Sequence, residues 1–197
     1  MNCLSDSIAT LQKSLQVLPG IGQKTAQRLA YFIVNQPKEK SQFIADSIIN
    51  ALHQCKICSL CFLLSDTDPC PICADQSRNQ ELLCIVENSQ DILLIENTRE
   101  YQGKYFVLGG VLSPLDGIGP NEIHLQELST LIHSHTFQEI IIALTPSTEG
   151  ETTIQFLADF FSGEKITRLS MGIPFGCDIE YTGSKTMLTA FRRRYPV

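Results

Sequence analysis

The chain has 197 residues, of which 43% are hydrophobic and 18% charged, a composition typical of a globular protein that excludes a disordered or fibrous one. No apolar run reaches the roughly 20 residues that span a bilayer, and residues 1–10 lack the basic and apolar regions of a secretory signal, so we expect a cytoplasmic protein without a membrane partner. The formal net charge of −6, taken alone, argues against a nucleic-acid partner.

The N-terminal part of the chain has a helical period. Apolar residues recur every three or four positions in residues 8–18, 26–33 and 44–52, the spacing of one face of a helix. Pro19-Gly20-Ile21-Gly22 separates the first two stretches, and Pro37 ends the second. The first fifty-odd residues are therefore predicted to form three amphipathic helices.

The turn between the first two helices has the features of a phosphate-binding element. Gly20 and Gly22 allow positive φ and a close approach of the backbone to a ligand. The second helix begins just after them, so its free N–H groups and positive dipole end face a bound anion. Lys24 and Arg28 are four residues apart and share a face beside that helix end. The segment resembles helix-hairpin-helix elements that hold a DNA phosphate, which makes these four residues the candidate DNA-binding residues.

Two alternatives compete with this interpretation. The glycines could only make the bend of a simple αα-corner. A dinucleotide-binding fingerprint is excluded, because the third glycine is missing and a helix, not a strand, precedes the turn.

The charge is distributed unevenly along the chain: residues 1–56 carry six Lys and Arg against three Asp and Glu, whereas residues 57–197 carry nine against eighteen. This imbalance indicates either an anionic partner for the first part or random surface charge.

Clustered cysteines predict a metal site. The chain has eight cysteines, many for a reducing compartment, where clustered pairs indicate metal ligands before disulfides. Cys58 and Cys61 form one C-x2-C pair, and eight residues later Cys70 and Cys73 form another. Four thiolates complete a tetrahedral shell that leaves no position for water, so we predict one structural Zn²⁺ per chain, with Fe²⁺ as the alternative metal.

Two neighbouring residues compete as ligands. Cys55 also makes a C-x2-C pair with Cys58, but its longer gap to Cys70 is less usual for so small a module, and His53 lies just before it. We treat both competitors as bystanders. The lone cysteines are predicted to be ordinary small residues, buried or half-buried; they are Cys3, Cys84 and Cys177.

From Glu81 onward, short apolar runs alternate with helical stretches, the pattern of a mostly parallel sheet covered by helices. In chain order we expect a strand at 82–86, a helix at 89–97 capped by Ser89, a strand at 105–108, a Gly/Pro-rich loop at 109–120, a helix from an Asn121 cap through Ile132, a strand at 139–144, a helix at 151–161 and a strand at 166–171. The run Ile140-Ile141-Ile142 indicates a strand covered on both faces.

Segments along nearly the whole chain resemble, in order, the RecR family of bacterial recombination mediators. They are the glycine turn, the four-cysteine spacing, LCIVE at 83–87, GGVLSPLDGIGP at 109–120, TPSTEGE at 145–151 and GIPFGCDIEY at 172–181. The resemblance implies an α+β chain of several parts: a helix-hairpin-helix region for DNA binding and dimerisation at 1–54, a C4 zinc finger at 55–77, a Toprim domain at 78–173 and a C-terminal segment at 174–197.

The Toprim likeness bears on catalysis. Catalytic members hold Mg²⁺ with a Glu after the first strand and an Asp-x-Asp after a later one. Glu87 matches the Glu, but Thr145-Pro146-Ser147 stands at the Asp-x-Asp positions, and hydroxyls are poor ligands for a hard cation. We therefore expect no catalytic residues and no enzymatic activity. The alternative is a metal-dependent nuclease or primase accessory whose site is rebuilt from Asp116, Glu149 or Glu151.

The resemblance also implies partners. RecR-like proteins act with RecO, and in some systems RecF, to load RecA onto single-stranded gaps coated by SSB. Glu87, Glu149 and Glu151, at the carboxyl edge of the predicted sheet, are the candidate RecO contacts, with a solvated loop as the alternative. A homo-tetrameric ring built from dimers, around gapped DNA or a junction of single- and double-stranded DNA, is implied as well.

The C-terminal segment contains a motif that superficially looks like a P-loop. In Gly183-Ser184-Lys185-Thr186, a serine stands where the glycine before Lys must be, and no glycine loop between a strand and a helix precedes it. No ATPase activity is predicted. Residues 192–194 are three consecutive arginines that could cover apolar surface, contact another subunit or touch DNA, and the sequence does not decide among these roles.

Overall fold

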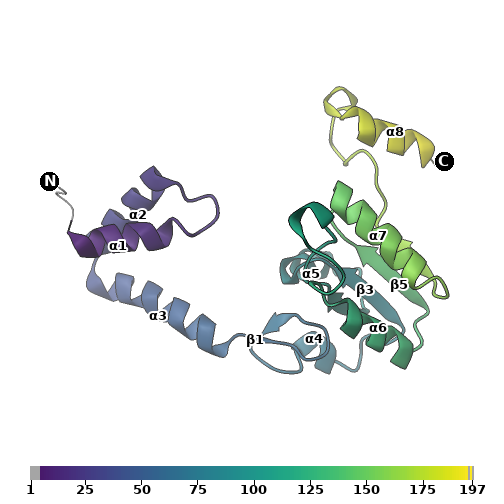
Figure 1. The fold of residues 1–197 in the computed structure, drawn as a ribbon, viewed down its shortest axis with the longest axis horizontal. Coiled ribbons are helices and arrows are strands. Elements are labelled where there is room, and N and C mark those ends of the chain that lie inside the picture. The colour runs from purple at the N-terminus through teal and green to yellow at the C-terminus, as the bar shows by residue number, and fades with distance from the viewer. Residues whose placement is uncertain (1–4, 195, 197) are drawn as a thin grey trace. The chain divides into compact units, whose positions relative to one another are not determined.

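The computed structural model describes residues 5–194 and 196 (Figure 1). The chain divides after Cys55 into two compact units, a helical unit and a larger unit that begins at Lys56. Helices, a parallel sheet and a small four-cysteine module together confirm the predicted α+β class. In the part of the chain that the structure describes, no helix is long and apolar enough to cross a membrane.

The helical unit confirms the three predicted helices. They are α1 (Asp6–Leu15), α2 (Gln23–Asn35) and α3 (Lys38–Gln54). Ser5 caps α1, because its Oγ accepts a hydrogen bond from the Ile8 N–H at 3.3 Å. α1 contacts α2, in which Ala26 and Ala30 are fully buried; side chains this small let two helices approach closely. Pro37 is the N-cap of α3, so the chain bends between α2 and α3.

The larger unit begins with the cysteine module, residues 56–74. It consists of β1 (Lys56–Ile57), β2 (Leu64–Ser65) and α4 (Pro71–Ala74). β1 and β2 pair antiparallel, so the loop between them folds back on itself. Cys58 and Cys61 lie in this loop, and Cys70 is the N-cap of α4. Two short backbone turns therefore present the two cysteine pairs.

Four parallel strands form the sheet of the α/β body, which follows the cysteine module. They are β3 (Leu82–Val86), β4 (Lys104–Val107), β5 (Glu139–Ala143) and β6 (Ile166–Arg168), in the order β4-β3-β5-β6. Neighbouring strands pair in parallel throughout, as the alternation of strand and helix predicted. Because carboxyl ends of parallel strands meet at one edge, the loops after β3 and β5 share that edge.

Helices cover both faces of the sheet, and side chains alternate between the faces along each strand. On β3, Leu83 and Ile85 pack into the core with α6 (Leu125–Ser134) and α7 (Thr148–Phe160). Cys84 and Val86 point to the other face and pack with Ile92 of α5 (Ser89–Glu96). Four of the five residues of β3 thus contribute to two cores, which explains why the strand is an unbroken apolar run.

Several predicted boundaries were wrong. Ser89 is the first residue of α5, not its cap; Asn88 is the N-cap and forms a capping box with Asp91. Asn121 does not cap α6, because three residues separate it from the helix and His124 is the N-cap. In the latter case the intervening residues form a turn, which the sequence pattern did not reveal.

Other differences are shifts of element ends. α7 begins at Thr148 rather than at residue 151, because Ser147 caps it. β6 ends at Arg168 rather than at residue 171.

The predictions for the lone cysteines had mixed outcomes: Cys84 is buried as predicted, Cys177 is exposed against the prediction, and Cys3 lies outside the described residues.

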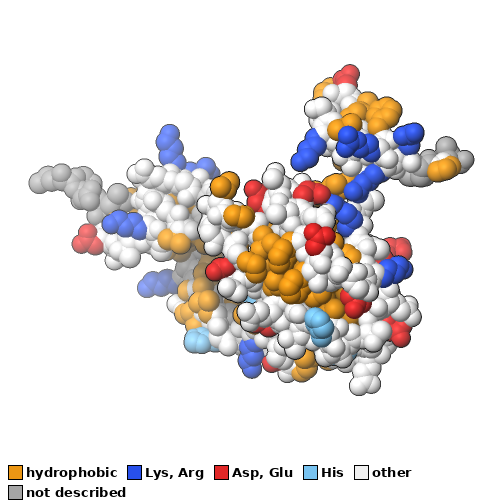
Figure 2. Space-filling view, turned by 45° about the vertical axis from the view of Figure 1, so that its right-hand side comes forward, with side chains coloured by type: hydrophobic (Ala, Val, Ile, Leu, Met, Phe, Trp, Pro, Cys, Tyr) orange, Lys and Arg blue, Asp and Glu red, His pale blue; other side chains and the backbone are white. Residues whose placement is uncertain are grey.

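The chain ends in η2 (Ile179–Tyr181) and α8 (Ser184–Arg192). Gly183 is the N-cap of α8, so the P-loop-like residues start a helix without a preceding strand-to-helix glycine loop. Lys and Arg side chains gather on this C-terminal part (Figure 2), where the exposed Arg192, Arg193 and Arg194 follow one another.

Candidate functional site

The turn between α1 and α2 is built to bring its backbone close to a ligand. Gly20 has φ +79°, a left-handed conformation that side chains with a Cβ rarely adopt. The Ile21 N–H donates to the Leu18 carbonyl at 3.1 Å and closes the bend. A Cβ at Gly20 or Gly22 would meet nothing within 4 Å, so open space surrounds both glycines. The turn therefore has the conformation and the clearance that a phosphate needs.

The start of α2 supplies the donors. Its N-cap is Gly22, which has no side chain to satisfy the first N–H groups of the helix. The first helical hydrogen bond is donated by Ala26 N–H to the Gly22 carbonyl at 2.9 Å. Lys24 and Arg28 are exposed beside this end, one helical turn apart. All four predicted DNA-binding residues thus lie on one short segment, a chemistry suited to an anion.

The four predicted metal ligands come together. Among the described residues, the Sγ atoms of Cys58, Cys61, Cys70 and Cys73 all lie within 4.8 Å of one another, and the group does not include Cys55. The Sγ atoms of Cys61 and Cys70 are 3.6 Å apart. A tetrahedral ion with Zn–S bonds of about 2.3 Å separates its sulfurs by about 3.8 Å, so the donor set fits one structural Zn²⁺.

Backbone N–H groups favour the thiolate at Cys58, whereas the contact with Cys73 and burial raise the pKa of Cys61, and burial raises the pKa of Cys70 to about 11. Although burial raises the pKa of Cys58, hydrogen bonds from the backbone N–H groups of Cys70, Leu60 and Cys61 lower it to about 7. The Cys70 N–H donates to the Cys58 Sγ at 3.3 Å, and the Cys73 N–H donates to the Cys70 Sγ at 3.4 Å. Amide donors stabilise negative sulfur. A bound Zn²⁺ supplies a cross-link between the two cysteine turns.

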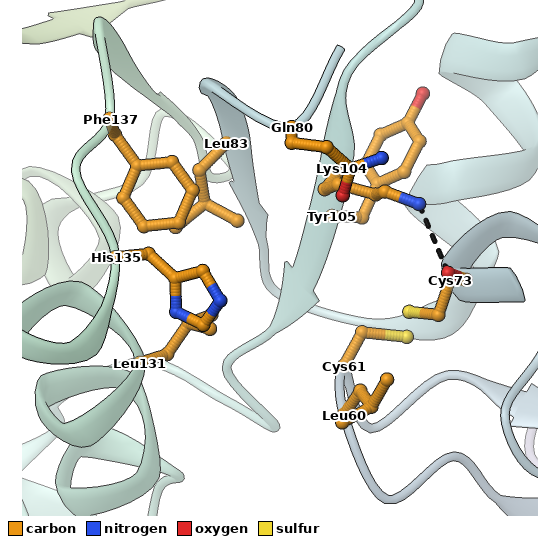
Figure 3. Close-up of a pocket in the computed structure, with 10 residues that line it drawn as sticks. All are labelled: Leu60, Cys61, Cys73, Gln80, Leu83, Lys104, Tyr105, Leu131, His135 and Phe137. Atoms are coloured by element: carbon orange, nitrogen blue, oxygen red, sulfur yellow. Dashed lines mark hydrogen bonds between the residues drawn. The ribbon is translucent and has the colours of Figure 1, made fainter. Parts of the chain in front are cut away.

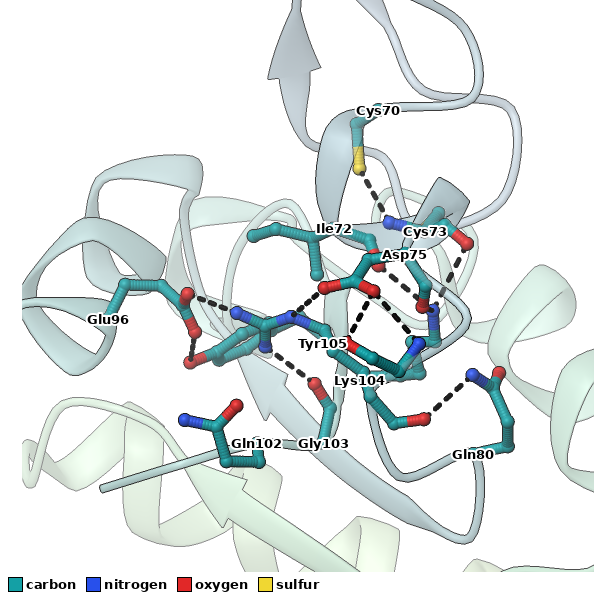
Figure 4. A network of polar contacts seen from close by, with 12 residues as sticks. Cys70, Ile72, Cys73, Asp75, Gln80, Glu96, Gln102, Gly103, Lys104 and Tyr105 are labelled. Carbon is teal, nitrogen blue, oxygen red and sulfur yellow. Dashed lines mark hydrogen bonds and ion pairs between the residues drawn. The ribbon is translucent and has the colours of Figure 1, made fainter. Parts of the chain in front are cut away.

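Lys104 of β4 ties the cysteine module to the sheet. Its ammonium donates to the carbonyls of Ile72, Cys73 and Asp75, at 2.9, 3.1 and 2.8 Å, at the C-terminal end of α4 (Figure 4). These carbonyls are the unpaired acceptors and the negative dipole end of that short helix. The Cys61 carbonyl accepts from the Val107 N–H of β4 at 2.8 Å. Both metal-binding turns are therefore fixed to one strand.

A second network meets the first at Asp75, whose Oδ2 lies 4.0 Å from the Arg78 Nε. Arg78 pairs with Glu96 of α5 and donates to the Gly103 carbonyl at 2.8 Å. The Tyr105 hydroxyl donates to the other oxygen of the same carboxylate at 2.7 Å. Burial, followed by the bond to Glu96, raises the pKa of Tyr105. The network joins the end of the cysteine module to α5, and its role is structural.

A cavity of about 130 Å³ lies between the cysteine module and the α/β body. Cys61 and Cys73 form one wall, and Leu131, His135 and Phe137 form the opposite one (Figure 3). Small-molecule pockets in proteins measure about 300–1,000 Å³, so this cavity is too small for a nucleotide. This cavity beside the cysteines is therefore not a binding site for a ligand of that size.

At the carboxyl edge of the sheet, a hydroxyl side chain has a structural role. Ser147, at the second Asp-x-Asp position, accepts a hydrogen bond from the Gly150 N–H at 2.9 Å and so caps α7. A Cβ at Gly150 would lie 1.9 Å from the Thr145 carbonyl oxygen, so α7 starts in direct contact with the turn. The hydroxyl at a position suited to a carboxylate is thus used to begin a helix.

The three candidate partner contacts lie at this edge. Glu87 follows β3, and Glu149 and Glu151 lie in the first turn of α7. Arg168, at the end of β6, donates to both oxygens of Glu151 at 2.8 and 2.6 Å. This pair lowers the pKa of Glu151, with the Arg168 hydrogen bonds as the main cause. Glu151 also lines a hollow of about 420 Å³ with Lys185, so the edge combines carboxylates with basic groups.

Sequence reasoning missed residues that hold these parts in place. Thr153 is fully buried; its hydroxyl donates to the Glu149 carbonyl at 2.8 Å and accepts from the Leu112 N–H at 2.8 Å. Phe62 stacks on His124 with ring centroids 3.9 Å apart. No local pattern marks the contact of Thr153 with Leu112 or that of Phe62 with His124, because these partners lie far apart in the sequence.

Comparisons with known proteins agree with this arrangement. Residues 8–52 match the family model described as RecR, helix-hairpin-helix; residues 53–75 match that of the RecR zinc finger domain with four cysteines; and residues 81–170 match the Toprim domain. Recombination protein RecR of Gloeothece citriformis is 43% identical over 188 residues, 95% of this chain and 94% of the relative.

Other curated relatives have the same name and similar coverage. Recombination protein RecR of Gloeobacter violaceus is 42% identical over 189 residues, 95% of this chain and 96% of the relative. That of Heliobacterium modesticaldum is 38% identical over 196 residues, 98% of each chain. With identities of this size over nearly the full length of both chains, and with its four cysteines and glycine turn arranged as described, the chain belongs to the RecR family of recombination proteins.

Proposed function

We propose that the chain is a DNA-binding recombination mediator that acts in the cytoplasm in the repair of gapped DNA. The observation that supports this most directly is the turn at Gly20, with its left-handed φ and the uncapped start of α2 beside Lys24 and Arg28. Backbone and cationic groups hold phosphates without reading bases. Such a contact suits a protein that must act at any gap, whatever its sequence.

The proposed mediator has no catalytic step of its own. Phosphoryl transfer in a Toprim site needs carboxylates that hold Mg²⁺. At the edge where they would stand, Ser147 caps α7, and Arg168 occupies both carboxylate oxygens of Glu151. A guanidinium in this position repels a divalent cation, which supports a docking role for the edge instead.

Within this proposal, the parts divide the work. Residues 1–54 bind DNA and dimerise, residues 55–77 form the zinc finger, residues 78–173 are the Toprim domain and residues 174–197 are the C-terminal segment. Glu87, Glu149 and Glu151 contact RecO, and RecF where it is present, and the complex loads RecA onto DNA coated by SSB. One basic turn per chain is a weak grip, so a tetrameric ring built from dimers would strengthen it through avidity.

The test is binding to gapped DNA across a salt series, with and without RecO. The Lys24→Ala/Arg28→Ala variant is expected to bind weakly to every sequence, with a salt slope smaller by about one per lost phosphate contact. Lys40→Ala, an exposed lysine on α3, is the matched control. An unchanged slope in the double variant would remove DNA contact from the turn, and binding that RecO does not strengthen would remove the docking role.

A second assay addresses the nuclease alternative. Pure protein with Mg²⁺ and gapped DNA is expected to give no cleavage, because the edge lacks the Asp-x-Asp carboxylates. Cleavage by the wild type that is lost in Glu87→Gln would show a rebuilt metal site and overturn the non-enzymatic proposal. Glu122→Gln, at an exposed residue of the loop before α6, controls for nonspecific effects of charge.

A further inference from the structure

Two aromatic side chains lie exposed on α2, between about two and three helical turns beyond the proposed phosphate-binding end. Tyr31 is 40% exposed and Phe32 is 63% exposed. The inner face of the helix is marked by Ala26 and Ala30, which are fully buried. By the period of 3.6 residues, Tyr31 and Phe32 fall on the opposite side of the helix, where polar residues are usual. Two large aromatic rings on this outer face are therefore accessible to a binding partner.

Positive charge follows the same face. Lys24, Arg28, Tyr31 and Asn35 are separated by steps of four, three and four residues, which places them in one stripe with Phe32 beside it. Arg28, Tyr31, Phe32 and Asn35 line one hollow of about 750 Å³. A cation and two aromatic rings are therefore presented together, next to a helix end suited to phosphate.

We propose that this face of α2 is a stacking platform for unpaired bases of the DNA strand whose backbone is held at the Gly20 turn. The inference rests on the proposed DNA binding and adds its substrate class, single-stranded DNA at a gap. Bases stack on aromatic side chains whatever their identity, because each base has a π-face, and Arg28 adds a cation above such faces. Platform and turn together recognise a single strand without recognising its sequence.

The dimensions are compatible with one continuous strand. At 1.5 Å per residue, Phe32 lies about 13 Å along the helix from Gln23, the length of about four stacked nucleotides at 3.4 Å each. A strand held at the start of α2 thus reaches both aromatic rings within a few nucleotides. Paired bases in a duplex present no free faces, so the platform favours gaps over intact duplex.

The alternative partner for the exposed apolar face of α2 is a second copy of the chain. The exposed apolar residues of α3, Ile48 and Leu52 among them, suit the self-association of the proposed ring better. Charged residues are depleted from the centres of protein interfaces. Lys24 and Arg28 run along the α2 stripe itself, so its charge complements a phosphate backbone rather than an identical, equally basic face.

The absence of tryptophan from the sequence allows a direct probe. In Phe32→Trp, the introduced indole is the chain's sole tryptophan, and Val34→Trp places one at an exposed site of α2 outside the stripe. A single-stranded oligonucleotide is expected to quench the emission at position 32 and not at position 34. The same strand made of abasic sites keeps the phosphates and should leave both emissions unchanged.

Affinity gives an independent measurement. Wild-type affinity for a gapped duplex should fall about tenfold when the bases of the gap are replaced by abasic sites, the effect of losing one or two stacked bases. Tyr31→Ala/Phe32→Ala should bind both gaps equally, with the salt slope of the wild type, and Tyr31→Phe should behave as the wild type. Should the double variant fail to fold, the wild-type abasic comparison and the tryptophan probes still decide.

The outcomes separate this inference from the proposed function. Equal wild-type affinity for normal and abasic gaps, with a slope that still depends on Lys24 and Arg28, would overturn the platform and leave the phosphate contact. Emission at position 32 that follows protein concentration and ignores DNA would show that copies of the chain meet on this face, which also overturns it. Loss of the dependence on Lys24 and Arg28 would instead overturn the proposed function.

Discussion

Arg168 and Glu151 form a bidentate ion pair, with the guanidinium nitrogens 2.8 and 2.6 Å from the two carboxylate oxygens. The pair connects the end of β6 to the first turn of α7, at the carboxyl edge of the sheet. Because both oxygens of Glu151 accept hydrogen bonds from Arg168, this carboxylate is already engaged within the chain. Among the proposed RecO contacts, Glu87 and Glu149 are therefore more important.

The ion pair predicts a pH-dependent stability. The pKa of Glu151 is lower in the folded chain than its ordinary value of 4.5, mainly because Arg168 donates to it. A carboxyl of this kind stabilises the fold while it is ionised, so the contribution is complete above pH 4.5 and is lost as the pH falls through the lower folded pKa. The melting temperature of Arg168→Met should therefore lie below that of the wild type at neutral pH, and the difference should shrink in acid. A difference that persists unchanged in acid would show that Arg168 acts through packing alone.

Removal of one cysteine tests the zinc site. Cys70→Ser should lose the bound metal, measured by elemental analysis, and its melting temperature should fall by at least about 5 °C, about 2 kcal/mol for a chain of this size. Cys55→Ser is the matched control, because Cys55 is exposed and outside the group of four sulfurs. One zinc per chain and an unchanged melting temperature in Cys70→Ser would show that other residues bind the metal.

Lys104 predicts a large effect for a single lysine. Lys104→Met keeps the length of the side chain and removes three charge-assisted hydrogen bonds to the end of α4, so we expect a loss of about 2–3 kcal/mol in the free energy of unfolding. Lys165→Met removes an exposed lysine 3.6 Å from Glu139 and should cost less than about 1 kcal/mol. Chemical denaturation of the zinc-loaded proteins measures both changes. Equal losses for the two variants would mean that the cysteine module is held without Lys104.

A side chain at position 150 should destabilise the fold through a steric clash. The Cβ added in Gly150→Ala would lie 1.9 Å from the Thr145 carbonyl oxygen, a backbone atom that cannot turn away, so the start of α7 must shift. We expect a loss of about 2 kcal/mol or more. Gly163→Ala adds the same atom where nothing lies within 4 Å and should change stability by no more than about 0.5 kcal/mol. Wild-type stability in Gly150→Ala would show that the turn at Thr145 is not rigid.

Features that depend on short spacings could be predicted from the sequence. The paired cysteines bring four sulfurs together through two local turns, and Gly20 makes a bend that two helical periods already required. Both need only residues that are close in the chain. The parallel sheet followed in the same way from the alternation of apolar runs and helical stretches.

Contacts between distant segments could not be predicted. In the sequence, Lys104 looks like an ordinary surface lysine at the start of a strand. Its role is not visible there, because the carbonyls that it binds belong to residues about thirty positions earlier. Helix starts failed for a related reason: Ser89 and Asn121 are good capping residues by type, but Asn88 and His124 hold the capping positions once the loops have packed. Residue type alone does not fix which of several polar neighbours caps a helix.

The hydrogen bond from the Val107 N–H to the Cys61 carbonyl bears on how easily the protein aggregates. β4 is an outer strand of the sheet, and an uncovered outer strand is a template on which further chains assemble into aggregates. The loop that contains Cys58 and Cys61 lies against β4 and covers this outer strand. Zinc starvation should thus cause this protein to aggregate.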